Sequence, residues 1–444
     1  MDHRKPAKVF CLTLGCSKNK VDSERIISAL SLNGFEPVSE AEDADAAIVN
    51  TCGFIRSAVE ENIGAILDLL ELKEKGSLKI VGVVGCLVAR YGGELKRSIP
   101  EVDFWAGCED IEPILASLTR EEPGVHRKAG DGRALSPSDF PHVRYLKISE
   151  GCSRACSFCT IPAIRGAMRS RPIRGLVEEA SELVRGGASE ICLVAQDLTA
   201  YGEDMGRKGA LIELLDALES SLPKDVWLRL LYLQPSGVDR ALLERVAGGR
   251  QVLPYLDIPI QHSVSRILEL MNRGSGEGMP GIFETARSIR HDFALRTTCM
   301  VGFPGETRRD FDSLLKFIEY VQFDRVGAFA FSPEEGTAAA GLTPQVAGRT
   351  RNSRLGRLMS LQEGISQARN SLFVGRELDV IIDETRPDGS AGSRSFREAP
   401  EVDGMVELAS APPGTKPGDK LRAVIDEALE HDLEASFVGA AGSA

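Results

Sequence analysis

The segment Val143-Arg-Tyr-Leu-Lys-Ile-Ser149, followed by Glu150-Gly-Cys152-Ser-Arg-Ala-Cys156-Ser-Phe-Cys159, joins a strand-like run to three closely spaced cysteines. The C-x3-C-x2-C spacing places three thiols on one short loop. Three thiols this close are not ordinary buried packing groups, and the loop is too tight to be a disulfide framework. The segment therefore predicts a metal centre directly after a strand.

An iron–sulfur cluster explains the spacing best. Three sulfurs on one loop can bind three irons of a 4Fe–4S cluster and leave the fourth iron open. An open metal position indicates chemistry rather than a structural role. Structural zinc is the alternative, but zinc needs a fourth Cys or His nearby, and none follows the triplet before Cys192.

The N-terminal third contains three short, almost wholly apolar runs, each ending at a cysteine. These runs are Lys8–Cys16, Ala46–Cys52 and Lys79–Cys86. Helix-like patterns at Val21–Leu32 and Ala58–Lys75 follow the first two. Apolar strands that alternate with helices predict an open parallel α/β sheet, in which ligands bind at the carboxyl ends of the strands.

Cys16, Cys52 and Cys86 would meet at that edge of the sheet and form a second group of three thiols. The alternative is three unrelated small apolar residues, since free cysteine is often buried. Their common position at strand ends favours a second iron–sulfur site. Cys11 and Cys108 lie off this pattern, and we interpret both as structural.

The middle of the chain predicts six β/α units and thus an incomplete TIM-like barrel. The strand-like runs are Val143–Ser149, Glu190–Gln196, Val226–Leu233, Tyr255–Ile260, Arg296–Val301 and Arg325–Phe331. Helical patterns between them are Leu176–Arg185, Leu211–Ser220, Ala241–Ala247, Phe283–His291 and Phe311–Val321. Active sites of such barrels lie at the carboxyl ends of the strands, where the cysteine triplet also falls.

Several polar or glycine-rich segments follow these strands, including Gln196-Asp197, Gln261-His262 and Gly302-Phe-Pro-Gly-Glu306. Gly302–Gly305 predicts a turn that lets the backbone approach a ligand closely. A plain β-turn is the alternative. Cys192 and Cys299 lie within predicted strands, so we assign them to the core.

The pattern changes again after residue 375, where short strands and frequent turns predict a small β-barrel of roughly 65 residues. Residues 371–444 contain 15 acidic and 7 basic residues, a net charge of −8. An RNA-binding barrel is expected to be basic. The acidity indicates docking of a positively charged protein, or simply a solvated surface.

Bulk composition agrees with a globular protein of several domains. The chain has 444 residues, 43% hydrophobic and 27% charged, and a net charge of −12. It shows no signal-peptide pattern at its start and no apolar run of the ~18 residues that cross a bilayer. We therefore expect a cytoplasmic protein, in which ten cysteines favour metal binding or catalysis over disulfides.

The whole chain resembles the methylthiotransferase family of radical S-adenosylmethionine (SAM) enzymes. The motifs that carry the resemblance are Gly15–Glu24, Asn50–Ile55, Leu146–Cys152, Gln196–Gly202, Tyr255–His262 and Ala399–Gly404, together with Val84-Gly-Cys86 and the triplet. Within the family the motifs are most similar to members that modify small-subunit ribosomal protein uS12. Relatives that modify tRNA usually have Gln-Asn in place of Gln196-Asp197. Leu231–Ser236 is less aromatic than is usual in the family.

The resemblance implies a methylthiotransferase domain at 1–122, a linker at 123–140, a radical SAM core at 141–370 and a TRAM β-barrel, antiparallel, at 371–440. It implies two 4Fe–4S clusters, with SAM near Gln196, Gln261, Val301 and Gly302. Cys152, Cys156 and Cys159 would hold the cluster that binds SAM, and Cys16, Cys52 and Cys86 an auxiliary cluster. No catalytic residue is implied beyond these ligands.

The implied reaction uses SAM twice. One SAM methylates a sulfur carried by the auxiliary cluster, and a second yields a 5′-deoxyadenosyl radical that removes hydrogen from the β-carbon of an aspartate of uS12. A flavodoxin or similar protein would supply electrons. Two alternatives remain: a tRNA adenosine methylthiotransferase with the same fold and clusters, and a non-catalytic iron–sulfur carrier or scaffold.

Overall fold

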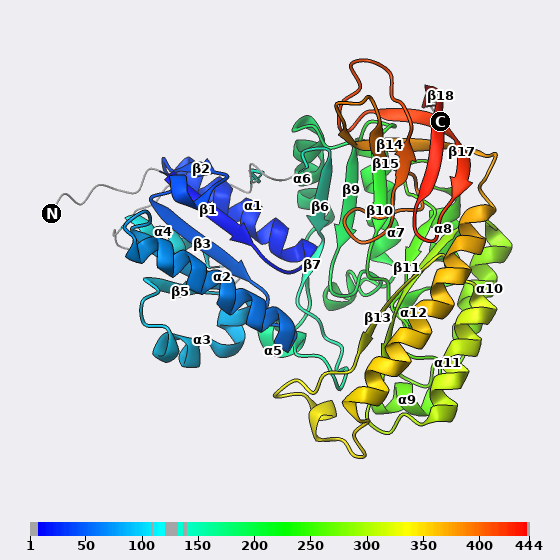
Figure 1. Cartoon of the computed structure of the whole chain (residues 1–444), viewed down its shortest axis with the longest axis horizontal. Helices are drawn as coiled ribbons and strands as arrows, with labels where there is room; N and C mark the ends of the chain where they lie inside the picture. Colours follow the sequence, from blue (N-terminus) through cyan, green and yellow to red (C-terminus); the bar gives the residue numbers. More distant parts are fainter. Residues whose placement is uncertain (1–7, 108–109, 120–131, 136–139, 442–444) are drawn as a thin grey trace. The chain divides into compact units, whose positions relative to one another are not determined.

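The computed structural model describes residues 8–107, 110–119, 132–135 and 140–441 (Figure 1). These residues form two compact units. Unit 1 contains the described residues up to 135 together with Glu150–Arg154 and Cys159–Arg169. Unit 2 contains Phe140–Ser149, Ala155–Phe158 and the described residues from Ser170 onward. The predicted linker, 123–140, lies outside the described residues except at 132–135 and 140.

Unit 1 is built on a parallel sheet in the strand order β2-β1-β3-β4-β5, which confirms the predicted open α/β sheet. Its strands are β1 (Lys8–Thr13), β2 (Glu36–Val38), β3 (Ala46–Thr51), β4 (Ile80–Gly85) and β5 (Phe104–Ala106). Every residue of β3 and β4 is buried, because helices cover both faces of the sheet.

The helices of unit 1 include α1 (Ser17–Leu32), α2 (Arg56–Glu74), α3 (Cys86–Ser98) and α4 (Ile111–Thr119). Ile48 packs in one hydrophobic cluster with residues of α1 and α4, and the next residue, Val49, in another with residues of α2 and α3. This alternation is the two-residue period of a strand. The pattern of the sequence missed α3, in which Gly92 and Gly93 disfavour a helix.

Unit 2 begins with the predicted incomplete barrel, which consists of the parallel sheets β6-β9-β10 and β11-β12-β13. The backbone N–H of Leu233 donates to Asp257 O at 2.8 Å and links the two sheets. The strands are β6 (Val143–Lys147), β9 (Glu190–Val194), β10 (Trp227–Leu230), β11 (Tyr255–Asp257), β12 (Ala294–Val301) and β13 (Arg325–Ala330). Two short strands, β7 (Ser149–Glu150) and β8 (Arg169–Ser170), pair with each other.

Helices follow the strands of the barrel. Five of them were predicted from the sequence: α6 (Ile173–Arg185), α7 (Ala210–Ser221), α8 (Arg240–Gly248), α10 (Met279–Ile289) and α11 (Arg308–Val321). The sequence pattern missed α9 (Ser265–Leu270) and α12 (Gly348–Ser371), and also the short helix α5 (Ile161–Arg165), which belongs to unit 1. Short 3-10 turns occur at Ala41–Asp43, Glu203–Met205, Pro235–Gly237 and Ala338–Gly341. No helix among the described residues is both long and apolar enough to cross a membrane.

The C-terminal barrel is closed in the order β14-β15-β16-β18-β17, as predicted for a small β-barrel. Its strands are β14 (Glu377–Thr385), β15 (Ala391–Arg394), β16 (Val406–Leu408), β17 (Lys420–Ala428) and β18 (Leu433–Ala440). Its pairings are antiparallel except that β16 and β18 run parallel, a pairing that the sequence did not indicate.

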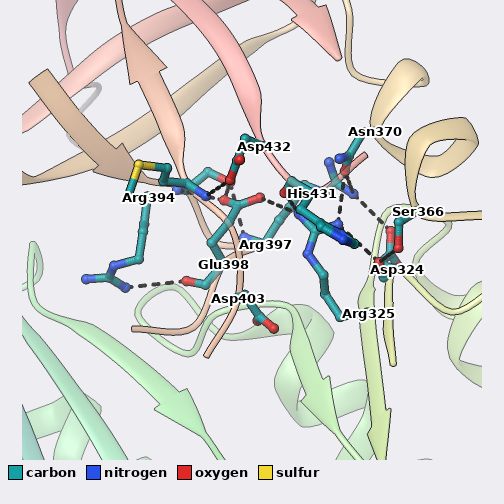
Figure 2. Close-up of polar contacts among 12 residues, drawn as sticks. Asp324, Arg325, Ser366, Asn370, Arg394, Arg397, Glu398, Asp403, His431 and Asp432 are labelled. Atoms are coloured by element: carbon teal, nitrogen blue, oxygen red, sulfur yellow. Dashed lines mark hydrogen bonds and ion pairs between the residues drawn. The ribbon is translucent and has the colours of Figure 1, made fainter. Parts of the chain in front are cut away.

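The C-terminal barrel packs against the amino-terminal ends of the strands of the incomplete barrel. Glu190, the first residue of β9, pairs with Arg394 of β15 at 2.7 Å. The hydroxyl of Tyr255, the first residue of β11, donates to Asp403 at 2.7 Å. Figure 2 shows the same arrangement at β13, where Asp324 pairs with Arg397 at 3.0 Å. The carboxyl ends of the strands therefore lie on the side away from the C-terminal barrel.

Candidate iron–sulfur and SAM sites

Cys16, Cys52 and Cys86 lie at the carboxyl ends of three neighbouring strands. Cys16 is the N-cap of α1, Cys52 directly follows β3, and Cys86 is the first residue of α3. In the sheet order β1 and β4 flank β3, and Thr51 pairs with Gly85 one residue before two of the cysteines. The structure thus brings together the three cysteines that the sequence placed at one edge.

Glycines allow these three segments to approach one another. Gly15 has φ +100°, and a Cβ there would lie 2.7 Å from Cys52 Cβ and 3.3 Å from Cys52 Sγ. A Cβ at Gly53 would lie 2.7 Å from the carbonyl oxygen of Cys86. Each cysteine-bearing loop therefore contacts the next at a position where no side chain fits.

Two buried asparagines hold the strand ends in this arrangement. The side-chain amide of Asn19 donates to Leu14 O at 2.8 Å and to Thr51 O at 3.0 Å, which ties the end of β1 to the end of β3. The amide of Asn50 donates to Asn19 O at 2.9 Å. Side-chain bonds of this kind satisfy carbonyls that the sheet leaves open at its edge.

The three thiols share one electrostatic environment. The pKa of Cys52 is raised to about 11, mainly by burial and also by negative charge on Cys16 and Cys86, whereas the Phe54 N–H and Arg165 oppose the shift. Three thiolates this close repel one another unless a cation lies among them. The donor set therefore fits a metal cluster better than it fits three free thiolates.

Arg165, the last residue of α5, places its guanidinium against this group within unit 1. Its Nε donates to Cys86 Sγ at 3.2 Å, and its other nitrogens lie 2.6 Å from Asn19 Oδ1 and 2.9 Å from Glu150 Oε1. Sequence reasoning missed Arg165, because nothing in its spacing from the triplet points to a cysteine 79 positions earlier.

The cysteine triplet follows β7 on a loop that needs glycine at its start. Gly151 has φ +74°, and a Cβ there would lie 2.4 Å from Ala167 O. The Cys152 N–H donates to Gly166 O at 3.0 Å, and the Arg154 N–H donates to Cys152 Sγ at 3.4 Å. All three cysteines of the triplet are partly exposed, and none is in a disulfide.

Within unit 2, the middle of this loop is fixed to the end of α9. Ser157 donates through its backbone N–H to Met271 O at 3.0 Å and through its hydroxyl to Leu270 O at 2.7 Å. Arg273 Nη1 lies 3.8 Å from Cys156 Sγ. The ring of Phe158 packs edge-on against that of Phe303, 6.5 Å between centroids. The middle of the loop, Ala155–Phe158, is thus held by the barrel residues of unit 2.

Gln196, Gln261, Val301 and Gly302, the residues predicted near SAM, all lie at or just beyond the carboxyl ends of barrel strands. Gln261 has φ +66°, and its buried Oε1 accepts no hydrogen bond from the described residues. A strained, unsatisfied polar side chain of this kind indicates a binding role. Val301 is fully buried in the hydrophobic core.

The predicted turn at Gly302 is closed by Glu306, whose carboxylate accepts from the Gly302 N–H at 2.6 Å and the Phe303 N–H at 3.1 Å. Arg354 of α12 pairs with this carboxylate at 2.8 Å. Burial raises the pKa of Glu306, and Arg354 opposes that shift. The neighbouring His262 is fully buried, and burial lowers its pKa to about 4, so the imidazole is neutral at pH 7.

The burial of the remaining cysteines in the described residues agrees with the interpretation of them as structural. Cys11, Cys192 and Cys299 are buried, whereas Cys108 lies outside the described residues. No three His, Cys, Asp or Glu side chains in the described part converge on one point as ligands of a single metal ion would. Each thiolate of a 4Fe–4S cluster binds a different iron, so cluster ligands need not converge in that way.

Three family models match successive parts of the chain. Residues 8–107 match the Uncharacterized protein family UPF0004, residues 146–318 the Radical SAM superfamily, and residues 374–438 the TRAM domain.

Curated relatives match over nearly the full length. The chain is 41% identical to the ribosomal protein uS12 methylthiotransferase RimO of Prosthecochloris aestuarii, covering 96% of this chain and 97% of the relative. It is 40% identical to RimO of Geobacter sulfurreducens, with the same shares, and 42% identical to RimO of Aquifex aeolicus, covering 96% of each chain.

Solved structures share the fold at low sequence identity. The radical SAM methyltransferase TsrM of Kitasatospora setae matches with a TM-score of 0.55 and 14% identity over 75% of this chain and 76% of that chain. The cobalamin-dependent radical SAM enzyme OxsB matches with a TM-score of 0.51 and 11% identity over 80% and 56% of the two chains.

Proposed function

This chain belongs to the RimO family of ribosomal protein uS12 methylthiotransferases, and on that basis we propose that it inserts a methylthio group at the β-carbon of an aspartate of uS12. The chain is a transferase of the radical SAM class. The observation that carries the proposal is the match to RimO relatives over 96% of the chain, in a fold that supplies two groups of three cysteines.

Two 4Fe–4S clusters with SAM are the proposed cofactors. Cys152, Cys156 and Cys159 would hold one cluster, and Cys16, Cys52 and Cys86 the other. When bound, these groups supply reductive cleavage of SAM and a position from which sulfur is transferred. The partly exposed thiols of the triplet and the shared environment of the strand-end thiols support this assignment.

Within this proposal, residues at the carboxyl ends of the barrel strands would bind SAM and fix its orientation. Gln261 offers an unsatisfied carbonyl oxygen at the mouth of the barrel, and Gln196 and Gly302 lie at the same end, where SAM would bind. Glu306 fixes the Gly302 turn through two backbone N–H groups. Because His262 is neutral and buried, it adds no charge beside that turn. A contribution from Val301 would come through its backbone.

The acidic C-terminal barrel is the proposed docking surface for the basic substrate protein, with nucleic acid contact not required. Its position at the amino-terminal end of the barrel strands means that it would hold uS12 at a distance from the strand ends where SAM would bind.

A flavodoxin or similar protein is the proposed electron donor, and the proposed location is the cytoplasm.

The domain division predicted from the sequence, 1–122, 123–140, 141–370 and 371–440, stays a proposal. The matched ranges 8–107, 146–318 and 374–438 fall within its three larger segments, which supports it.

Anaerobic reconstitution with iron, sulfide, SAM and dithionite, in the presence of both uS12 and unmodified tRNA, tests the function. We expect 5′-deoxyadenosine and a methylthio group on one aspartate of uS12, found by mass spectrometry. Cys156→Ala should abolish both products, whereas Cys299→Ala, at a buried core thiol, should retain them. Methylthio-adenosine in tRNA with unmodified uS12 would show the tRNA enzyme instead, and absence of 5′-deoxyadenosine would show a carrier.

A further inference from the structure

Arg165 links the three strand-end cysteines to two carboxylates inside unit 1. Its Nε donates to Cys86 Sγ at 3.2 Å, while Nη2 pairs with Asp22 at 3.1 Å and Nη1 with Glu150 at 2.9 Å. The side chains of Arg165, Asp22 and Glu150 are each less than 10% exposed. All the nitrogens of the guanidinium therefore have a buried partner, and one of those partners is a predicted cluster ligand.

We propose that Arg165 is a positioning residue that raises the reduction potential of the iron–sulfur cluster at Cys16, Cys52 and Cys86 by donating its Nε–H to the Cys86 sulfur. This inference rests on the proposed function, because it presumes a cluster at those cysteines. It concerns the protein's control of that cluster, a property separate from the activity itself.

The way in which the three nitrogens of the Arg165 guanidinium are shared among different partners supports a role beyond pairing with the two carboxylates. An arginine that served only to neutralise Asp22 and Glu150 could do so with its two terminal nitrogens. The third donor, Nε, points instead at a sulfur, and Asn19 Oδ1 at 2.6 Å from Nη2 fixes the orientation of the plane. Because partners on α1, β7 and α3 surround the group, its position relative to Cys86 is set from several directions.

Hydrogen bonds and positive charge near a cluster stabilise its reduced form, which carries one more negative charge. A lysine at position 165 would keep the charge but present a single ammonium that reaches fewer partners. We therefore expect Arg165→Lys to shift the potential to a more negative value, and Arg165→Gln, which also removes the charge, to shift it further in the same direction.

The test uses the full chain with Cys152, Cys156 and Cys159 replaced by alanine, so that only the strand-end site can load. Redox titration followed by electron paramagnetic resonance gives the midpoint potential of this triple-alanine parent and of its R165K and R165Q variants. Arg133→Lys is the matched control, because Arg133 is another buried arginine of unit 1 and pairs with Glu24 of α1.

A negative shift in R165K, larger in R165Q and absent in Arg133→Lys, is the expected result. An R165K protein that loads its cluster but keeps the parent potential would overturn the inference while leaving the proposed function intact. Because R165Q leaves two carboxylates without their cation and can fail to fold, R165K alone decides the outcome. Absence of iron from the triple-alanine parent would contradict the proposed function itself, and the inference with it.

Discussion

Gly15 shows how closely a single position can control the proposed N-terminal cluster site. A methyl group there would lie 2.7 Å from Cys52 Cβ, at a backbone φ of +100°. We predict that Gly15→Ala moves Cys52 away from its neighbours, so that the iron content after reconstitution falls from about eight to about four per chain. Iron analysis of the reconstituted protein measures this loss.

Gly34→Ala is the matched control for that substitution. Gly34 also has a left-handed φ, +86°, but no atom lies within 4 Å of a Cβ built there. Both variants carry the backbone cost of alanine at positive φ, about 1 kcal/mol. If the two variants lost equal amounts of iron, backbone strain would explain the loss, and the steric explanation would be contradicted.

His262 gives a prediction of pH dependence. Burial lowers its pKa to about 4, whereas an unfolded histidine titrates near ~6.5. Between these values the unfolded chain binds a proton that the folded chain does not, so the free energy of unfolding falls as the pH drops from about 6.5 to about 4. Its contribution is fully present above this window.

Urea unfolding of the apo-protein across this pH range is the measurement. Across this range the free energy of unfolding of the wild type should fall by on the order of 3 kcal/mol more than that of His262→Gln. His291→Gln, at an exposed histidine, should follow the wild-type curve. Parallel curves for wild type and His262→Gln would show that this imidazole does not titrate in the window.

Residues differ in how readily sequence reveals their roles. The six candidate ligands could be found because thiols repeat at a fixed spacing in one loop and at the ends of three strands. Arg165 and Asn19 could not, since their partners come from segments that only the folded chain brings together. Polar contacts between distant positions leave no period in the sequence.

At the scale of elements, Glu190 at the start of β9 joins the incomplete barrel to the C-terminal barrel. Its fully buried carboxylate pairs with Arg229 at 2.6 Å and Arg394 at 2.7 Å, and these cations hold its pKa below the usual value despite burial. Glu190→Gln should destabilise the protein by about 3–5 kcal/mol, because it leaves two buried cations without their full counter-charge.

Thermal or denaturant unfolding checks this cost. Glu178→Gln is the control, since Glu178 pairs with Arg174 on the exposed face of α6, where water screens the two charges and the pair adds little to stability. If the two variants lost equal stability, the junction between the barrels would not depend on the buried pair.

A helix or strand could be predicted from the sequence when its buried positions are apolar. β3 and β4 were predicted because both of their faces are apolar and buried. α12 was not, although it is the longest helix among the described residues, because its buried face carries Arg354, Gln362, Ser366 and Asn370 beside Leu358. These residues repeat every four positions, but polar side chains hide the period from a search for apolar stripes.

At the scale of the whole molecule, the order of α/β sheet, incomplete barrel and small β-barrel could be predicted from strand and turn patterns alone. The position of the C-terminal barrel at the amino-terminal ends of the strands could not be predicted. It depends on pairs such as Asp324 with Arg397, whose residues lie far apart in sequence (Figure 2). Some acidic residues of the C-terminal barrel, such as Glu398 and Asp403, therefore form ion pairs inside the protein.

The proposed function requires two clusters, held on two separate groups of cysteines. Iron and sulfide analysis with Mössbauer spectroscopy should give about eight irons for the reconstituted wild type. About four should remain when Cys16, Cys52 and Cys86 are replaced by alanine, and about four when Cys152, Cys156 and Cys159 are replaced. A wild type with about four irons, or an unchanged iron content in either variant, would contradict the presence of two clusters.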